Sequence, residues 1–217
     1  MTNKRSFLRK LFLIALLIFA LAGGVWYGAR IFQGKKEPEE ETVETLSTEA
    51  NLKVAFIGDS GYGKNFEGVL QLIKSEGADL VLHQGDFDLV NDPPGFFTRI
   101  DRILGPNFPY FISVGNHDVA AWGGYAQFLK ERMTRLNLSP DDPDLSDQKY
   151  SLTYKGLRMV FVGENGRNAE FAQFLKSQLP EEDRIWRICS WHKNQTAMQV
   201  GGKGDEMGWE VYEICRG

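Results

Sequence analysis

Short apolar runs alternate with amphipathic segments between residues 53 and 136. The runs KVAFIG, DLVLHQ and PYFISV have the length and apolar content of buried strands. Between them apolar side chains recur at helical spacing, and Gly77 ends the first of these helical segments. Strands that alternate with helices predict an α/β fold with a parallel sheet. The expected elements are strands at 53–58, 79–84 and 109–114 and helices at 65–76, 96–104 and 123–136.

The pattern changes after a loop rich in proline and aspartate at 139–147. The strand-like runs YSLTY and LRMVFV flank Lys155-Gly156, which is a hairpin signal. A helix at 168–179, a strand at 184–190 and a last helix over WEVYEIC follow. The chain is therefore predicted to form parallel strands first and an antiparallel part later, which gives an α/β fold with mixed sheets.

An uncharged apolar run covers 19 residues, 11–29, and follows a basic segment at 1–10. As a helix it is about 28 Å long, close to the thickness of a bilayer core. Trp26 and Tyr27 suit the aromatic belt of a membrane interface. We expect a transmembrane helix or signal anchor at 11–29 and a domain that lies outside the cytoplasm, periplasmic or extracellular. The residues at 20–22, Ala-Leu-Ala, fit a cleavage pattern, so secretion after signal cleavage is the alternative.

Charge divides the chain into unlike parts. Residues 1–36 carry seven basic and no acidic side chains, whereas 37–50 carry six glutamates and no base. We interpret 30–50 as an acidic linker and 51–217 as a single globular domain. The net charge of −4 argues against a general nucleic-acid binder, which needs a basic face. Two cysteines are too few for a disulfide scaffold or a four-cysteine zinc site.

Polar side chains follow a glycine at the end of each of the first three predicted strands. These tips read Gly58-Asp59, Gly85-Asp86 and Gly115-Asn116-His117-Asp118. The intervals between the tips are close to one βαβ unit of about 30 residues, so the tips are expected to meet at one edge of a parallel sheet. Carboxylate, amide and imidazole ligands suit divalent Mn, Fe or Zn. Asp86, on the middle tip, is placed to bridge two ions.

The segments GDSG, QGDFD, GNHD and CSWH resemble, in this order, motifs of the calcineurin-like metallophosphoesterase superfamily, in particular its purple-acid-phosphatase-like branch. The resemblance covers roughly residues 52–217. It implies a mixed-sheet αββα sandwich and a phosphoric ester hydrolase that uses a metal-activated hydroxide. Its substrate would be a phosphate ester, and monoesters, diesters, nucleotides and phosphoproteins all stay open.

The resemblance also implies roles for individual residues. Asp59 resembles a ligand of the first metal ion, and Asp86 resembles the carboxylate that bridges both ions. Asn116 and His192 resemble ligands of the second ion. His117 resembles the residue that protonates or steadies the leaving oxygen, with Asp118 as the partner that orients it.

The chain departs from the family pattern in two ways. Leu89 stands where this branch carries a metal-binding tyrosine, and Gly61 stands where other branches carry a histidine; Asp88 is a neighbouring acid that is open as a substitute. No histidine follows His192, so the closing GHxH motif does not occur in these 217 residues. We therefore expect a C-terminally incomplete sandwich that holds one metal ion, through Asp86, Asn116 and His192, where the family holds two.

Several alternatives stay open. One is a catalytically inactive or truncated domain of the same fold, with a metal-binding or interaction role. Another is a nucleotide binder, because GDSGYGK fits a P-loop, although Asn65 replaces the hydroxyl residue that holds Mg²⁺. His83 lies within a strand and is interpreted as a hydrogen-bonded interior residue. Cys189 and Cys215 fit either one disulfide or two separate thiols.

Overall fold

The structure is a computed structural model, and it describes residues 51–141, 144–164, 166–179, 186–194, 204 and 206–216. The predicted membrane segment at 11–29 and the predicted linker at 30–50 lie outside these residues. Within the described part of the chain, no helix is both long and apolar enough to cross a membrane.

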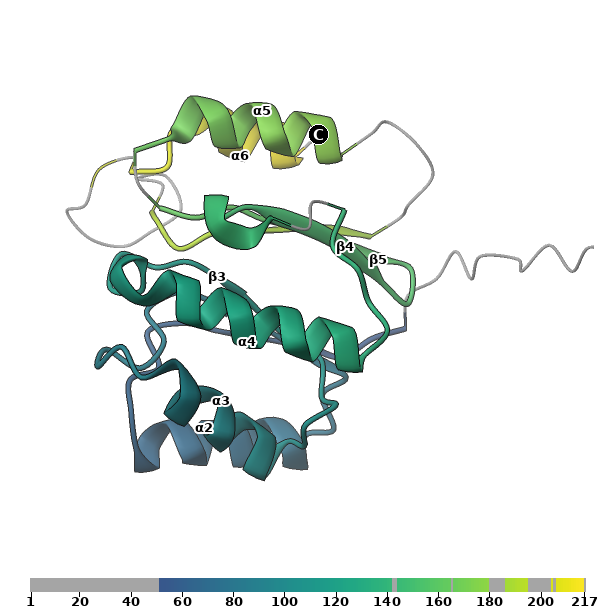
Figure 1. The fold of residues 1–217 in the computed structure, drawn as a ribbon. Helices are drawn as coiled ribbons and strands as arrows, with labels where there is room; N and C mark the ends of the chain where they lie inside the picture. The colour runs from purple at the N-terminus through teal and green to yellow at the C-terminus, as the bar shows by residue number, and fades with distance from the viewer. Residues whose placement is uncertain are drawn as a thin grey trace, which may run out of the picture. The chain divides into compact units, whose positions relative to one another are not determined.

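The first sheet is parallel, as the alternation of strands and helices predicts. Its strands are β1 (Val54–Ile57), β2 (Leu80–Gln84) and β3 (Tyr110–Ser113), in the order β1-β2-β3. Of the connecting helices, α2 and α3 lie on the side of this sheet away from the second sheet, and α4 packs against α3 (Figure 1). Each buries an apolar face, as amphipathic helices of α/β folds do. These helices are α2 (Lys64–Ser75), α3 (Pro93–Ile103) and α4 (Trp122–Arg135).

The second sheet is mixed. β4 (Tyr150–Tyr154) pairs antiparallel with β5 (Leu157–Phe161), and β5 pairs parallel with β6 (Arg187–Ser190). The β4–β5 turn has φ values of 46° at Lys155 and 84° at Gly156, and two positive values are what a tight two-residue hairpin requires. Helices α5 (Asn168–Gln178) and α6 (Trp209–Arg216) lie on the outer side of this sheet (Figure 1).

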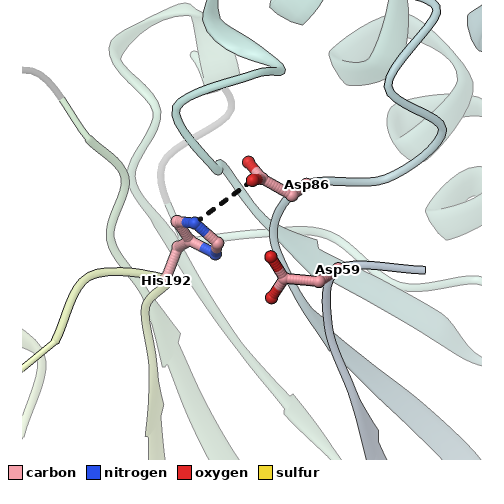
Figure 2. A group of neighbouring side chains, drawn as sticks. All are labelled: Asp59, Asp86 and His192. Carbon is pink, nitrogen blue, oxygen red and sulfur yellow. Dashed lines mark ion pairs between the residues drawn. The ribbon is translucent and has the colours of Figure 1, made fainter. Parts of the chain in front are cut away.

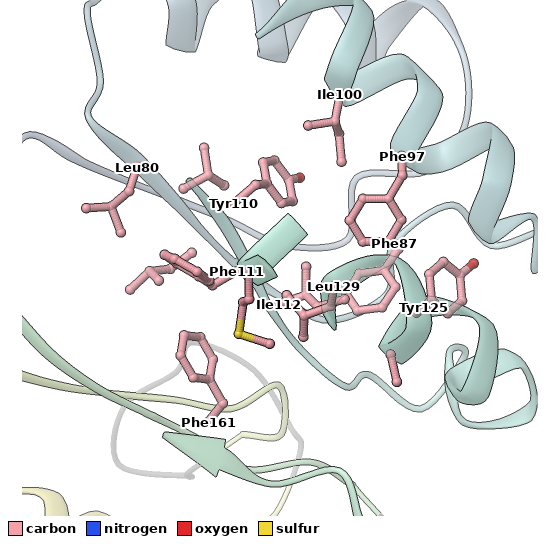
Figure 3. Packing of buried hydrophobic residues seen from close by; sticks show 14 of the residues in the cluster. Leu80, Phe87, Phe97, Ile100, Tyr110, Phe111, Ile112, Tyr125, Leu129 and Phe161 are labelled. Atoms are coloured by element: carbon pink, nitrogen blue, oxygen red, sulfur yellow. The ribbon is translucent and has the colours of Figure 1, made fainter. Parts of the chain in front are cut away.

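The two sheets pack face to face and complete an αββα sandwich. Tyr150 of β4 stacks on Phe161 of β5 with ring centroids 4.3 Å apart. Its hydroxyl donates to the carbonyl oxygen of Ile112 at 2.8 Å and accepts from the Ile112 amide at 3.1 Å. Phe111 of β3 also faces Phe161 across this core (Figure 3). The mixed-sheet sandwich expected from the sequence is therefore confirmed for the described residues.

Contacts near the ends of β3 and β6 position the candidate site. The hydroxyl oxygens of Ser113 and Ser190 lie 2.5 Å apart and both side chains are buried. This hydrogen bond joins the last residue of β3 to the last residue of β6, so the chain after β6 emerges beside the tips of the first sheet. His192 lies only two residues beyond Ser190.

The start of α3 and one short 3₁₀ helix differ from the sequence prediction. Helix α3 begins at Pro93, three residues earlier than expected, because the Asp92 carboxylate accepts a hydrogen bond from the Gly95 amide and caps the helix. Prolines are tolerated in a first turn, where amides have no helical partner. The 3₁₀ helix η2 (Leu145–Asp147) lies in the segment 139–147, which the sequence predicts to be a loop, and the 3₁₀ helix η1 (Val119–Ala121) directly precedes α4.

Cys189 and Cys215 form a disulfide. Of the two states that the sequence left open, the structure therefore has the paired one. The bond joins β6 to α6 across a separation of 26 residues. It fastens α6 to the strand that leads to His192.

Candidate metal centre

The tips of β1 and β2 lie side by side at one edge of the first sheet, as predicted. The Asp59 amide donates to the carbonyl oxygen of Gly85 at 3.1 Å, and the Ser60 amide donates to that of Asp86 at 3.1 Å. Asp59 and Asp86 both have positive φ values, of 49° and 53°. Such values are uncommon for residues with a side chain and concentrate at functional sites.

Two of the three tip glycines are required by close packing. A Cβ on Gly85 would lie 2.6 Å from the Gly115 Cα and 2.8 Å from the His192 Cγ, and Gly85 also has a φ of +84°. A Cβ on Gly115 would lie 2.3 Å from the Asp86 amide nitrogen. A Cβ on Gly58 would meet its nearest atom, the Gln84 carbonyl oxygen, only at 3.6 Å, which is an ordinary contact.

We expect Gly85→Ala to lower the free energy of unfolding by about 3 kcal/mol, because the new methyl group adds a clash with backbone to a disfavoured φ. Gly58→Ala is the matched control and should change it by less than about 0.5 kcal/mol. Urea denaturation of both variants measures the difference. Equal stabilities for the two variants would contradict the packing argument.

Three ligand-capable side chains converge at these tips. One ligand atom from each of Asp59, Asp86 and His192 lies within 4.8 Å of the others (Figure 2). Asp86 is buried and Asp59 is exposed. Two carboxylate oxygens and one imidazole nitrogen form a donor set that suits Mn, Fe or Zn. Two bonds of about 2.1 Å span at most about 4.2 Å, so the set lies close to a geometry that holds one ion.

The orientation of the His192 ring supports this assignment. Its Nδ1 lies 2.7 Å from the carbonyl oxygen of Gln84, and a carbonyl only accepts, so Nδ1 carries the proton. In the neutral ring Nε2 then presents a lone pair, and it lies 3.5 Å from the Asp86 Oδ2 (Figure 2). A metal ion bound here would accept a lone pair from each of these two atoms. The residues present therefore fit one metal ion.

Three of the four predicted metal ligands lie together in the structure. The sequence assigned Asp59 to a first ion and His192 to a second, with Asp86 between them. The structure gathers all three into one donor set. The Asn116 side-chain oxygen accepts a hydrogen bond from the Lys193 ammonium at 3.1 Å. Its assignment as a metal ligand stays a prediction.

His117 lies at the rim of the site. Its backbone amide donates to the Asp86 Oδ1 at 3.1 Å, and its ring Nε2 lies 3.9 Å from the Asp86 Oδ2. The side chain is 59% exposed, so it is accessible to a group that binds beside Asp86. This position is compatible with the predicted transfer of a proton to a leaving oxygen.

Asp118 is buried beneath the tips and binds backbone. Its Oδ2 accepts from the amides of Asp86 and Gly115 at 2.8 Å, and its Oδ1 accepts from the Phe87 amide at 3.0 Å. Burial raises the pKa of this carboxyl to about 6, against the opposing effect of the three amides. Asp118 therefore ties the second and third tips together, and its predicted action on His117 stays a prediction.

Two other candidate residues, Asp88 and His83, make contacts that stabilise the fold. Asp88, considered as a substitute ligand, is buried, and its carboxylate accepts from the amides of Val90, Asn91 and Asp92. It shapes the loop in which Leu89 is exposed. His83 is fully buried, with Nδ1 2.9 Å from the Tyr110 hydroxyl. Burial lowers its pKa to about 3, so His83 is the neutral interior residue that the sequence predicted.

One of the comparisons with known proteins matches most of the chain. The sequence model of the family described as calcineurin-like phosphoesterase matches residues 52–216. A search of curated proteins gave no match. Among solved structures, the chain is similar to the purple acid phosphatase PPD1 from yellow lupin (Lupinus luteus) seeds, at 17% identity and a TM-score of 0.47. That match covers 65% of this chain and 30% of the lupin chain, so this chain spans under a third of its length.

Proposed function

Because the chain belongs to the calcineurin-like phosphoesterase family, we propose that it hydrolyses a phosphate ester with one divalent metal ion. The observation that supports this most directly is the convergence of Asp59, Asp86 and His192, with the His192 Nδ1 held by the Gln84 carbonyl and Nε2 directed at Asp86. No nucleophilic Ser or Cys is required, because a bound divalent ion supplies a water of lowered pKa and polarises the phosphoryl oxygen.

The residues of the chain have separate tasks in this proposal. Asp59, Asp86 and His192 hold the ion, and the Gln84 carbonyl keeps the His192 ring in its ligating tautomer. His117 is exposed beside Asp86 and donates a proton to the leaving oxygen of the ester. Asp118 holds the tips of β2 and β3 together, so that the ligands are preorganised.

We also propose that the domain acts outside the cytoplasm, tethered to a membrane through residues 11–29. The apolar run and the acidic segment that follows it support this placement. The Cys189–Cys215 disulfide adds support, because disulfides persist in oxidising compartments and are rare in the cytosol.

The test is a direct assay of the full chain. We expect the purified protein to bind Mn²⁺ and to hydrolyse a generic aryl phosphate, with activity lost on chelation and restored by added Mn²⁺. Equilibrium dialysis measures the binding, and release of the aryl alcohol measures the reaction. Binding without turnover would favour the alternative of a catalytically inactive domain of this fold. ATP binding that is lost in Lys64→Ala and kept in Asp86→Ala would favour the P-loop alternative.

A further inference from the structure

Lys193 reaches the candidate site because it follows His192 directly. The same backbone that brings the His192 ring to Asp86 brings the Lys193 ammonium to Asn116, where Nζ lies 3.1 Å from Oδ1. The Lys193 side chain is only 20% exposed, although lysines normally extend into water. Lys193 is therefore not an ordinary surface lysine, because its ammonium contacts the oxygen of a predicted metal ligand.

The Lys193 ammonium lies at a position surrounded by oxygen atoms from three separate segments. Besides Asn116, it lies 3.4 Å from the Glu164 Oε2 and 3.6 Å from the Glu206 Oε1. Glu164 follows β5, Asn116 follows β3, and Glu206 precedes α6, so tertiary folding alone assembles this position. Glu206 is itself held by the Asn194 side-chain amide at 3.1 Å.

Glu164 provides a second observation. Its Oε2 is buried, and among the described residues no donor is in hydrogen-bond geometry with it. A buried carboxylate oxygen without a hydrogen bond is costly unless a positive charge lies close to it. The Lys193 ammonium is the cation that lies there. Without this charge, the Asn116, Glu164 and Glu206 oxygens would face one another around a position that suits a divalent cation.

We infer that the Lys193 ammonium serves as the second cation of the site: it fills the position beside Asn116, so that the site takes one divalent ion. This inference rests on the proposed metal site and goes beyond it, because it assigns the second positive charge to a side chain. Lys193 thereby excludes a second ion from Asn116. Its charge also remains beside the site at any metal concentration.

The test counts bound Mn²⁺ in the full chain and in Lys193→Met, a change that keeps the length of the side chain and removes its charge. We expect one bound Mn²⁺ in the wild-type chain and two in Lys193→Met, measured by equilibrium dialysis. Adding Glu164→Gln to Lys193→Met should weaken the second ion about tenfold or more, because one of its oxygens loses its charge. Lys176→Met, on the exposed face of α5, is the matched control and should keep one ion.

The outcomes separate this inference from the proposed function. Two ions in the wild-type chain, or one ion in a folded Lys193→Met variant, would overturn the role of Lys193 and leave the single-ion proposal to its own assay. Circular dichroism establishes that the variants are folded. A second ion that Glu164→Gln does not weaken would also overturn the inference, because the vacated position would then not be its binding site. A wild-type chain that binds no Mn²⁺ would overturn the proposed function itself.

Discussion

Replacing Asp86 by asparagine is expected to lower phosphoesterase activity by about three orders of magnitude, because a bound ion contributes several kcal/mol to the stabilisation of the transition state. Asp86 is central to the site: its Oδ2 lies 3.5 Å from the His192 Nε2 and 3.9 Å from the His117 Nε2. Asparagine keeps the shape of the side chain and removes the charge that binds the ion. Mn²⁺ binding should therefore fall together with the rate of aryl phosphate hydrolysis.

Asp88→Asn is the matched control for this prediction. Asp88 lies two residues further along the same loop and is also buried, but its carboxylate accepts from three backbone amides of the loop. We expect Asp88→Asn to reduce stability while Mn²⁺ affinity stays within about tenfold of the wild-type value. Retained activity in Asp86→Asn would contradict the assignment. A loss of Mn²⁺ in Asp88→Asn as large as in Asp86→Asn would instead make Asp88 a ligand.

We also expect the buried side chain of His83 to lower the stability of the folded protein at acid pH. Burial, with a smaller effect from the charge of His192, lowers the pKa of His83 from 6.5 to about 3 in the folded protein. Between these two pH values the unfolded chain binds the proton and the folded chain does not. Stability therefore falls as the pH falls below 6.5, by up to about 5 kcal/mol, at 1.36 kcal/mol for each unit of pKa difference.

The double variant His83→Phe/Tyr110→Phe isolates this contribution. It removes the titrating ring together with its hydrogen-bond partner, and an apolar pair of similar shape is tolerated far better than one unpaired group. Phe66, Phe87 and Phe96 surround His83, so a phenyl ring suits this part of the core. Urea denaturation between pH 7 and pH 4 should show a flatter pH dependence in the double variant than in the wild-type chain.

Asp118 has the opposite effect on the pH dependence of stability. It is present in both the wild-type chain and the double variant. Its pKa is raised to about 6 by burial, so the folded chain binds its proton more readily, and this group favours folding as the pH falls through 6. The difference between the wild-type chain and the double variant therefore reports His83 alone. Identical slopes would mean that His83 is not the group that takes up protons on unfolding.

The order of elements and the edge at which the candidate site lies were predictable from the sequence. Apolar runs with the lengths of buried strands, separated by amphipathic helices, specify a parallel sheet, because each helix must return the chain to the same edge before the next strand begins. Asp59 and Asp86 follow two such strands directly. Their meeting at one edge is therefore a consequence of local patterns repeated along the chain.

The contacts that give the site its chemistry were decided by the packing of the second sheet on the first. His192 binds the carbonyl oxygen of Gln84, 108 residues earlier in the chain, and Lys193 reaches Asn116 across 77 residues. No pattern of neighbouring residues encodes these distances. They depend on the approach of β6 to β3, which the buried hydrogen bond between Ser113 and Ser190 records.

By itself, the sequence determined the class of fold, the sheet edge and the residue types gathered there, because strand and helix patterns are local. Only the tertiary structure decided which side chain faces which. It grouped Asp59, Asp86 and His192 into one donor set, directed Asp118 to backbone amides, and placed an ammonium beside Asn116. Electrostatic contacts act over a few ångströms between distant segments, so they depend on how the two sheets pack and cannot be derived from spacing along the chain.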